Sequence, residues 1–209
     1  KHLTAYQNGA LADRYVALVD KVRVAEKRLG TEETKLADAV ARNYAKLLAY
    51  KDEYEVARLH AESAFAAQIE RQFEGDFKLK FHLAPPLFAK RDPETGHLMK
   101  QEFGGWMLHA FRVLAQLKFL RGTAFDPFGY TAERKEERAL IGQYESLVDE
   151  LLAGLSPQNL DLAVKLASIP DDIRGYGHVK DAHLRKAKAK EADLLAQWRN
   201  PEAMKQAAE

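Results

Sequence analysis

The chain has 209 residues, 46% of them hydrophobic and 30% charged, which suits a folded domain with a sizeable core and is too apolar for a disordered protein. Its net charge of +1 gives no electrostatic reason to expect nucleic acid, and the absence of cysteine excludes disulfides and thiolate-held iron–sulfur clusters within this segment. No apolar run approaches the roughly 20 residues of a membrane-spanning helix, so we expect a cytoplasmic protein without membrane contact. Because the chain starts at Lys1 and not at Met, we expect it to be part of a longer polypeptide.

Residues 1–72 are predicted to form helices, the first two of them paired in a hairpin. Apolar residues recur at spacings of three and four from Thr4 to Leu29, which predicts one helix that ends at Gly30. Thr31 has the chemistry of an N-cap for a second helix, and the short turn predicts that the two helices are antiparallel. The stretch 51–72 is also helical in composition, either as one helix or with a break near 60–63. Its core candidates are Val56, Leu59, Phe65, Ile69 and Phe73.

Residues 73–105 break the helical pattern and predict a β-ribbon. From Phe77 to Leu83 apolar residues alternate with polar ones, which is the period of a half-buried strand. Residues 92–96 have the chemistry of a turn, and 97–103 are expected to pair back as a second short strand. Because a two-stranded ribbon alone is only marginally stable, it must rest on helices or on another domain.

Residues 106–199 are predicted to be helical again. The stretch from Trp106 to Leu120 is apolar nearly all round, which is typical of a central, buried helix. Thr131 and Ser156-Pro157 each have the chemistry of a helix start, and a last helix is expected over 179–199. The whole chain, 1–209, is therefore predicted to be a single mainly α (α+β) domain of several helices with a small β-ribbon or short antiparallel sheet.

A search for reactive motifs leads to no catalytic residue and no metal ligand. The sequence has no phosphate-binding loop, nucleophile elbow or zinc-hydrolase signature. Glu74-Gly75-Asp76 lacks the paired asparagines that follow in a thiamine diphosphate site. His109 is expected to lie in the core or in an interface, with its hydrogen-bonding groups satisfied.

Two loops, 121–130 and 173–178, combine glycines, aromatic residues and charge, and such loops often carry contacts. The simpler interpretation is that Phe125, Phe128 and Tyr130 plug the end of the helical core. Alternatively the basic residues bind an anion, since guanidinium groups suit bidentate contacts to carboxylate or phosphate. The candidates for such anion contacts are Arg121, Arg134, Arg174, His178 and Lys180.

Six sequence blocks follow one another in the order seen in a known family. They are YKDEYEVARL (50–59), FEGDF (73–77), FHLAPP (81–86), RGTAFD (121–126), FGYT (128–131) and IRGYGHVK (173–180). These blocks resemble the C-terminal region of the fused bacterial indolepyruvate ferredoxin oxidoreductase family. The resemblance extends over nearly the whole chain, and no catalytic residue of that family maps onto it.

The resemblance implies a parent enzyme that oxidatively decarboxylates an aryl-2-oxoacid such as indolepyruvate to its acyl-CoA, with ferredoxin as the electron acceptor. That parent would use thiamine diphosphate, Mg²⁺, an iron–sulfur cluster and CoA, and we expect this segment to hold none of them. Its expected role is structural, packing against other domains of the same polypeptide. The alternatives are a domain that supplies CoA- or substrate-anion contacts to the parent active site, and an independent helical protein-interaction module. Assembly into a homo-oligomer stays open.

Overall fold

The computed structural model describes residues 1–30, 33–62, 71–72, 78–83 and 99–200. Helices dominate these residues and are accompanied by one two-stranded antiparallel sheet, which confirms the predicted mainly α fold with a small ribbon. The chain divides into two compact units, which we call unit 1 (1–50 and 136–209) and unit 2 (51–135). The predicted parts 1–72, 73–105 and 106–199 divide the chain differently, since in unit 2 α4 (Glu53–Glu62) packs against α6 (Met107–Gln116).

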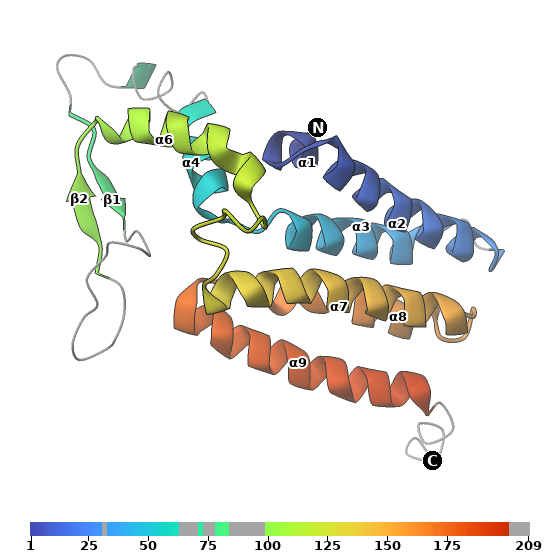
Figure 1. The fold of residues 1–209 in the computed structure, drawn as a ribbon. Helices are drawn as coiled ribbons and strands as arrows, with labels where there is room; N and C mark the ends of the chain where they lie inside the picture. The colour runs from blue at the N-terminus through green and yellow to red at the C-terminus, as the bar shows by residue number, and fades with distance from the viewer. Residues whose placement is uncertain (31–32, 63–70, 73–77, 84–98, 201–209) are drawn as a thin grey trace. The chain divides into compact units, whose positions relative to one another are not determined.

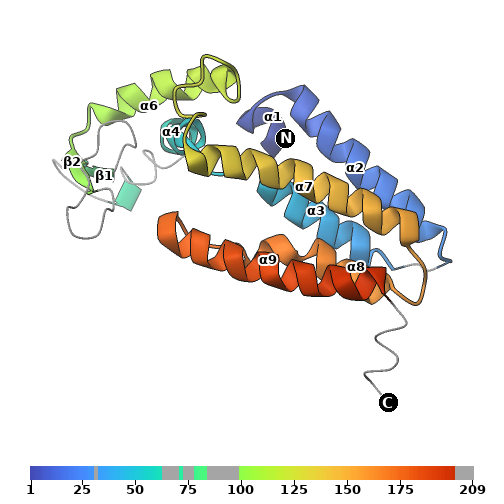
Figure 2. The same ribbon diagram turned by 60° about the horizontal axis from the view of Figure 1, so that its bottom comes forward.

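Unit 1 is an all-helical assembly. It contains α1 (His2–Tyr6), α2 (Gly9–Lys27), α3 (Lys35–Leu48), most of α7 (Ala132–Gly154), α8 (Leu160–Ala167), the 3₁₀ helix η2 (Ile169–Asp172) and α9 (Gly177–Arg199). Its long helices lie side by side in both views (Figures 1 and 2). Apolar side chains of α3, α7 and α8 meet in its core, where Val40, Val148 and Ala163 have no exposed surface.

The α2–α3 hairpin is present as predicted, and a buried carboxylate of α2 stabilises the start of α3. Gly30 lies in the turn after α2 with a φ of 76°, a value that favours glycine. Glu26, only 1% exposed, accepts hydrogen bonds from the backbone N–H groups of Leu36 (2.8 Å) and Ala37 (2.9 Å). A carboxylate at this position satisfies N–H groups that have no partner within the helix and suits its positive end. The predicted cap, Thr31, lies outside the described residues.

Two predicted helix boundaries are wrong, and an asparagine side chain explains each. The helix expected from Thr4 to Leu29 is interrupted, because Asn8 accepts a hydrogen bond from the N–H of Leu11 (2.9 Å) and thereby starts α2. The helix expected to begin at Ser156-Pro157 begins only at Leu160. There Asn159 accepts from the N–H of Ser156 and donates to the carbonyl of Gly154, both at 2.8 Å, which holds the connection as a turn.

Unit 2 packs a β-ribbon against two helices. It contains α4 (Glu53–Glu62), β1 (Phe81–Leu83), β2 (Gln101–Phe103), α6 (Met107–Gln116) and the 3₁₀ helix η1 (Leu117–Leu120). The strands are antiparallel with Phe81 opposite Phe103, which confirms the predicted ribbon. Phe81 meets the ring of Phe111 edge-on at 5.5 Å, so the ribbon rests on α6. None of the described helices combines the length and apolarity needed to cross a bilayer.

The prediction that the helix from Trp106 to Leu120 is buried all round is wrong. One face of α6 buries Met107, Phe111 and Ala115. Val113 on the same helix is 61% exposed, and Phe119 of η1 is 65% exposed. The segment therefore has one packed apolar face and one solvent-facing side, on which Val113 lies together with the polar residues His109, Arg112 and Gln116.

Other predicted core residues also differ from expectation. His109 is exposed on the solvent-facing side of α6, which contradicts a core position and leaves an interface position as a prediction, and Leu59 of α4 is 42% exposed. Val56 is half-buried. The remaining core candidates of the stretch 51–72, Phe65, Ile69 and Phe73, lie outside the described residues, as does the turn predicted at 92–96.

Candidate functional site

The most distinctive polar arrangement in the described residues is a buried cluster in unit 2. Its members come from two stretches that are far apart in sequence, the start of α4 and the loop between η1 and α7. We call it the Asp52–Asp126 cluster, and it consists of Asp52, Tyr54, Glu55, Arg121 and Asp126, each no more than 6% exposed.

A buried ion pair joins the two stretches. The Arg121 guanidinium donates through Nε to Asp52 Oδ2 and through Nη2 to Asp52 Oδ1 (2.9 Å), and both side chains are at most 4% exposed. Asp52 Oδ1 also accepts from the backbone N–H of Glu55 (2.8 Å), so the same carboxylate caps α4. Removing one partner would leave an uncompensated charge in the interior, which makes this pair costly to break.

Asp126 organises the loop that follows η1. Its Oδ1 accepts from the Tyr54 hydroxyl and from the N–H of Phe128, both at 3.1 Å, and its Oδ2 accepts from the N–H of Gly122 at 2.8 Å. Gly122 has a φ of 74°. A Cβ atom on Gly129 would lie 2.7 Å from Asp126 Oδ2, closer than such atoms approach. Both glycines are therefore needed for the loop to close around the carboxylate.

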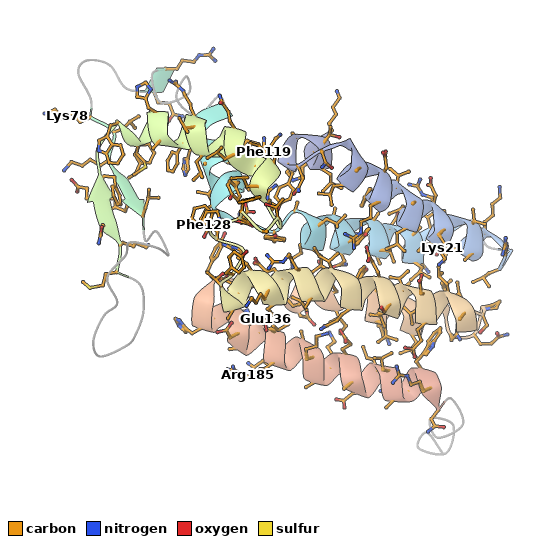
Figure 3. All side chains as sticks on the ribbon, viewed as in Figure 1. Lys21, Lys78, Phe119, Phe128, Glu136 and Arg185 are labelled. Atoms are coloured by element: carbon orange, nitrogen blue, oxygen red, sulfur yellow. The ribbon has the colours of Figure 1, made fainter. Side chains whose placement is uncertain are left out.

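Tyr54 lies between the two acidic residues of the cluster. Burial, followed by the neighbouring Asp126 carboxylate, raises the pKa of its phenol well above the ordinary value, so the hydroxyl stays protonated and donates. The guanidinium carbon of Arg121 lies 5.5 Å from the centre of the Tyr54 ring. Phe128, labelled in Figure 3, packs edge-on against the same ring at 5.4 Å.

The interpretation of the loop as an aromatic plug is correct only for Phe128. Phe128 is half-buried against Tyr54, whereas Phe125 is 81% exposed and Tyr130 is 61% exposed. Because the Asp126 carboxylate turns inward, its neighbour Phe125 turns out to solvent. A polar residue, and not the aromatic residues, fills the centre of this loop.

Of the five candidates for anion contacts, Arg121 and Arg134 lie in unit 2 and have carboxylate partners there. Arg121 binds Asp52 as described, and Arg134 donates to both carboxylate oxygens of Glu53 at 3.3 and 3.4 Å. Arg58, a neighbour of the cluster, forms a bidentate pair with the cluster member Glu55 at 2.7 and 2.8 Å. The N–H donors of these arginines are thus directed at carboxylates of the chain itself.

The other three candidates, Arg174, His178 and Lys180, lie in unit 1 around the start of α9. Lys180 pairs with Glu137, and these side chains are 12% and 8% exposed. Arg174 is exposed and donates through Nε to the carbonyl of Asp171 (2.8 Å). His178 is exposed in the first turn of α9.

Sequence reasoning missed Asp52 and Tyr54, although one signal was present. Asp52 followed three residues later by Glu55 is a capping-box pattern that marks a helix start. Nothing local indicates that Arg121, 69 residues further on, is the partner of Asp52. Within the described part of the chain, no group of three or more acidic or histidine side chains is arranged to hold a metal ion.

The cluster can therefore hold two stretches of unit 2 together, and its charged groups have hydrogen-bonding partners in the same chain. Comparison with known proteins matches residues 1–193 to a family of unknown function (DUF6537). No curated protein and no solved structure matches the chain. Since the match spans most of its length, the chain belongs to the DUF6537 family, whose function is unknown.

Proposed function

We propose that the chain is an accessory, structural domain of an indolepyruvate-type 2-oxoacid:ferredoxin oxidoreductase. The parent enzyme would act in the cytoplasm with thiamine diphosphate, Mg²⁺, an iron–sulfur cluster and CoA held by its other domains. Ferredoxin would take the electrons. This domain would pack against those other domains and carry out no chemistry by itself.

The proposal is supported by the contacts that the residues of the family resemblance make within the chain. The blocks at 50–59 and 121–126 supply every member of the Asp52–Asp126 cluster, and the block at 128–131 supplies Phe128, which packs against Tyr54. The charged side chains in these blocks that could otherwise bind an anion or act in catalysis have partners within the chain. Arg121 pairs with Asp52, and Asp126 accepts hydrogen bonds from Tyr54 and from two backbone N–H groups. Because these side chains already bind partners within the chain, they support a structural role for the blocks.

One second candidate has an observation in its favour. Arg174 and His178 are exposed, Arg174 just before α9 and His178 in its first turn, and Gly175 and Gly177 between them have φ values of 91° and 53°. These two side chains are open to solvent next to the N-terminus of a 23-residue helix, where an anion is favoured. In this alternative the domain would supply contacts to CoA phosphates or to the 2-oxoacid carboxylate.

One set of variants in the full-length polypeptide separates the two proposals. Arg121→Ala should lower the melting temperature, because it leaves Asp52 buried without its counter-charge at a cost of about 3 kcal/mol. The KM values for CoA and indolepyruvate of the folded enzyme should not change. Arg174→Ala with His178→Ala should leave the melting temperature and both KM values unchanged, as should the exposed control Arg185→Ala.

The measurements are ferredoxin reduction with indolepyruvate and CoA, together with thermal unfolding. A rise of about tenfold in either KM for the Arg174/His178 variant at unchanged melting temperature would overturn the structural role in favour of the anion contact. Absence of ferredoxin reduction by the unaltered full-length polypeptide would reject both proposals. An independent protein-interaction module would then be the remaining alternative.

A further inference from the structure

The β-ribbon of unit 2 opens at the end where β2 leads into α6. Its ladder stops at the pair Phe81–Phe103. Continued by two residues, the same register would place Lys80 opposite Gly104 and Leu79 opposite Gly105. In place of those pairs there is a hollow of about 420 Å³, lined by Lys78, Leu79, Lys80, Glu102, Gly104 and Gly105. Lys78 is labelled at this end of the ribbon in Figure 3.

On its glycine side the hollow exposes main chain. Gly104 and Gly105 are exposed, and a Cβ atom added to Gly105 would meet nothing within 4 Å. In the described part of the chain the sheet has two strands, so each has one edge without a strand beside it. An extended peptide can add to such an edge through main-chain hydrogen bonds.

The charges around the hollow favour an acidic partner. The described residues 78–83 and 99–105 contain three lysines (Lys78, Lys80 and Lys100) and one acid (Glu102), a balance of +2 in a chain whose net charge is +1. Lys80 pairs with Glu102 at 2.8 Å, but these side chains are 59% and 51% exposed. An exposed pair of this kind contributes little, so a carboxylate of a partner can replace Glu102 at low cost.

An exposed aromatic residue adds an apolar contact beside the lysines. Trp106 is 61% exposed, and its ring lies edge-on to Phe103 with centroids 6.1 Å apart. Its Cδ1 atom lies 3.6 Å from the position of a Cβ on Gly104, so the indole borders the glycine side of the hollow. Tryptophan is the residue type most enriched among the side chains that dominate binding energy at protein interfaces.

We propose that this hollow binds an extended, carboxylate-rich segment of a partner protein. The segment adds to the sheet next to residues 78–80, its acidic side chains contact Lys78 and Lys80, and an apolar side chain packs on Trp106. A small anion is a poorer match, because the lysines that line the hollow are exposed and do not enclose a charge. The proposal does not depend on the oxidoreductase proposed above.

The test uses a fluorescein-labelled peptide of alternating glutamate and valine and the chain 1–209. Fluorescence anisotropy should show saturable binding that weakens with added salt. Because the chain has only two tryptophans, a Trp198→Phe variant reports on Trp106 alone, and its emission should change on binding. Lys78→Glu with Lys80→Glu should weaken binding about tenfold, through two lost charge contacts.

Two further variants control for charge and for folding. Gly105→Val should also weaken binding, because it fills the hollow without altering charge and has space for its side chain. Arg185→Glu with Lys186→Glu, an equal charge change on an exposed face of α9, should have no effect. Equal binding of unstructured polyglutamate, or unchanged affinity after the Lys78/Lys80 and Gly105 substitutions, would overturn the proposal. The lysines would then only protect the ribbon edge from aggregation.

Discussion

Carboxylates that join separate helices are the main residue-scale feature of this protein, and Glu145 on α7 is the clearest case in unit 1. Arg14 of α2 donates to both of its oxygens at 2.7 Å, and the Tyr44 hydroxyl of α3 donates to Oε1. Tyr44 stacks between Tyr15 and Tyr144, with centroid separations of 6.0 and 6.1 Å. Burial alone would raise the pKa of Glu145, but the hydrogen bonds from Arg14 and Tyr44 outweigh burial and lower it.

The lowered pKa makes a pH-dependent prediction. A carboxyl group whose pKa is lower in the folded than in the unfolded state stabilises the fold above its unfolded pKa, about 4.3 for glutamate, and this contribution is lost as the pH falls through the folded value. At pH 7 Glu145→Gln should therefore lower the free energy of unfolding by about 1 kcal/mol. Urea unfolding from pH 7 to pH 3 should show this difference shrinking below about pH 4. A difference that stays constant over that range would contradict the assignment.

Among the elements, the loop between η1 and α7 has the most specific sequence requirements. The Asp126 carboxylate of this loop is buried, in an interior position that an apolar side chain would usually occupy. Gly129 is buried and its Cα approaches that carboxylate so closely that no side chain fits. The conformation of the loop therefore depends on a glycine and an aspartate three residues apart.

A pair of glycine substitutions tests this requirement. Gly129→Ala should destabilise the protein by about 1–3 kcal/mol, because its methyl group would overlap Asp126. Gly142→Ala, in the exposed interior of α7 with open space around it, should stabilise the protein by about 0.5–1 kcal/mol. Thermal unfolding of both variants is the measurement. A Gly129→Ala protein as stable as the unaltered chain would show that the loop adapts without cost.

Elements with a strong local pattern could be predicted from the sequence, and those set by distant partners could not. The apolar stripe of α7 and the alternation in β1 reflect burial of one face, which sequence periodicity records directly. The start of α3 depends on Glu26, and the candidate site depends on Arg121 reaching Asp52 across 69 residues. Such partners are chosen by the tertiary fold. The exposure of Phe125 follows from Asp126 turning inward, which residue type alone does not indicate.

At the scale of the whole molecule, the two units have cores of different make-up. In unit 1 the helices α1, α2, α3, α7 and α8 contribute buried apolar residues to one shared core. In unit 2 the described core is built around Phe81, Met107 and Phe111, and the Asp52–Asp126 cluster lies beside it. Because burial of apolar surface stabilises more reliably than buried ion pairs, we expect unit 2 to open more easily.

Hydrogen exchange tests whether the units open separately. Backbone amides in the middle of α3 and α7 should exchange most slowly, and those of α4 and α6 should exchange faster. Phe111→Ala should remove about 3–5 kcal/mol of packing from unit 2 and accelerate exchange in α4 and α6 while leaving α3 unchanged. Equal acceleration in α3 would mean that both units unfold as one.

The insertion of unit 2 into the sequence of unit 1 has a consequence for how the chain folds. Residues 51–135, a stretch of 135 − 51 + 1 = 85 residues, separate the two parts of unit 1. Contacts such as Tyr44 with Tyr144 must close this long loop, at an entropic cost that grows with the length of flexible chain. Early formation of unit 2 would shorten the flexible part of the loop and so accelerate docking of α7 on α3. Unit 2 would thereby accelerate the folding of unit 1, whatever partner unit 2 itself binds.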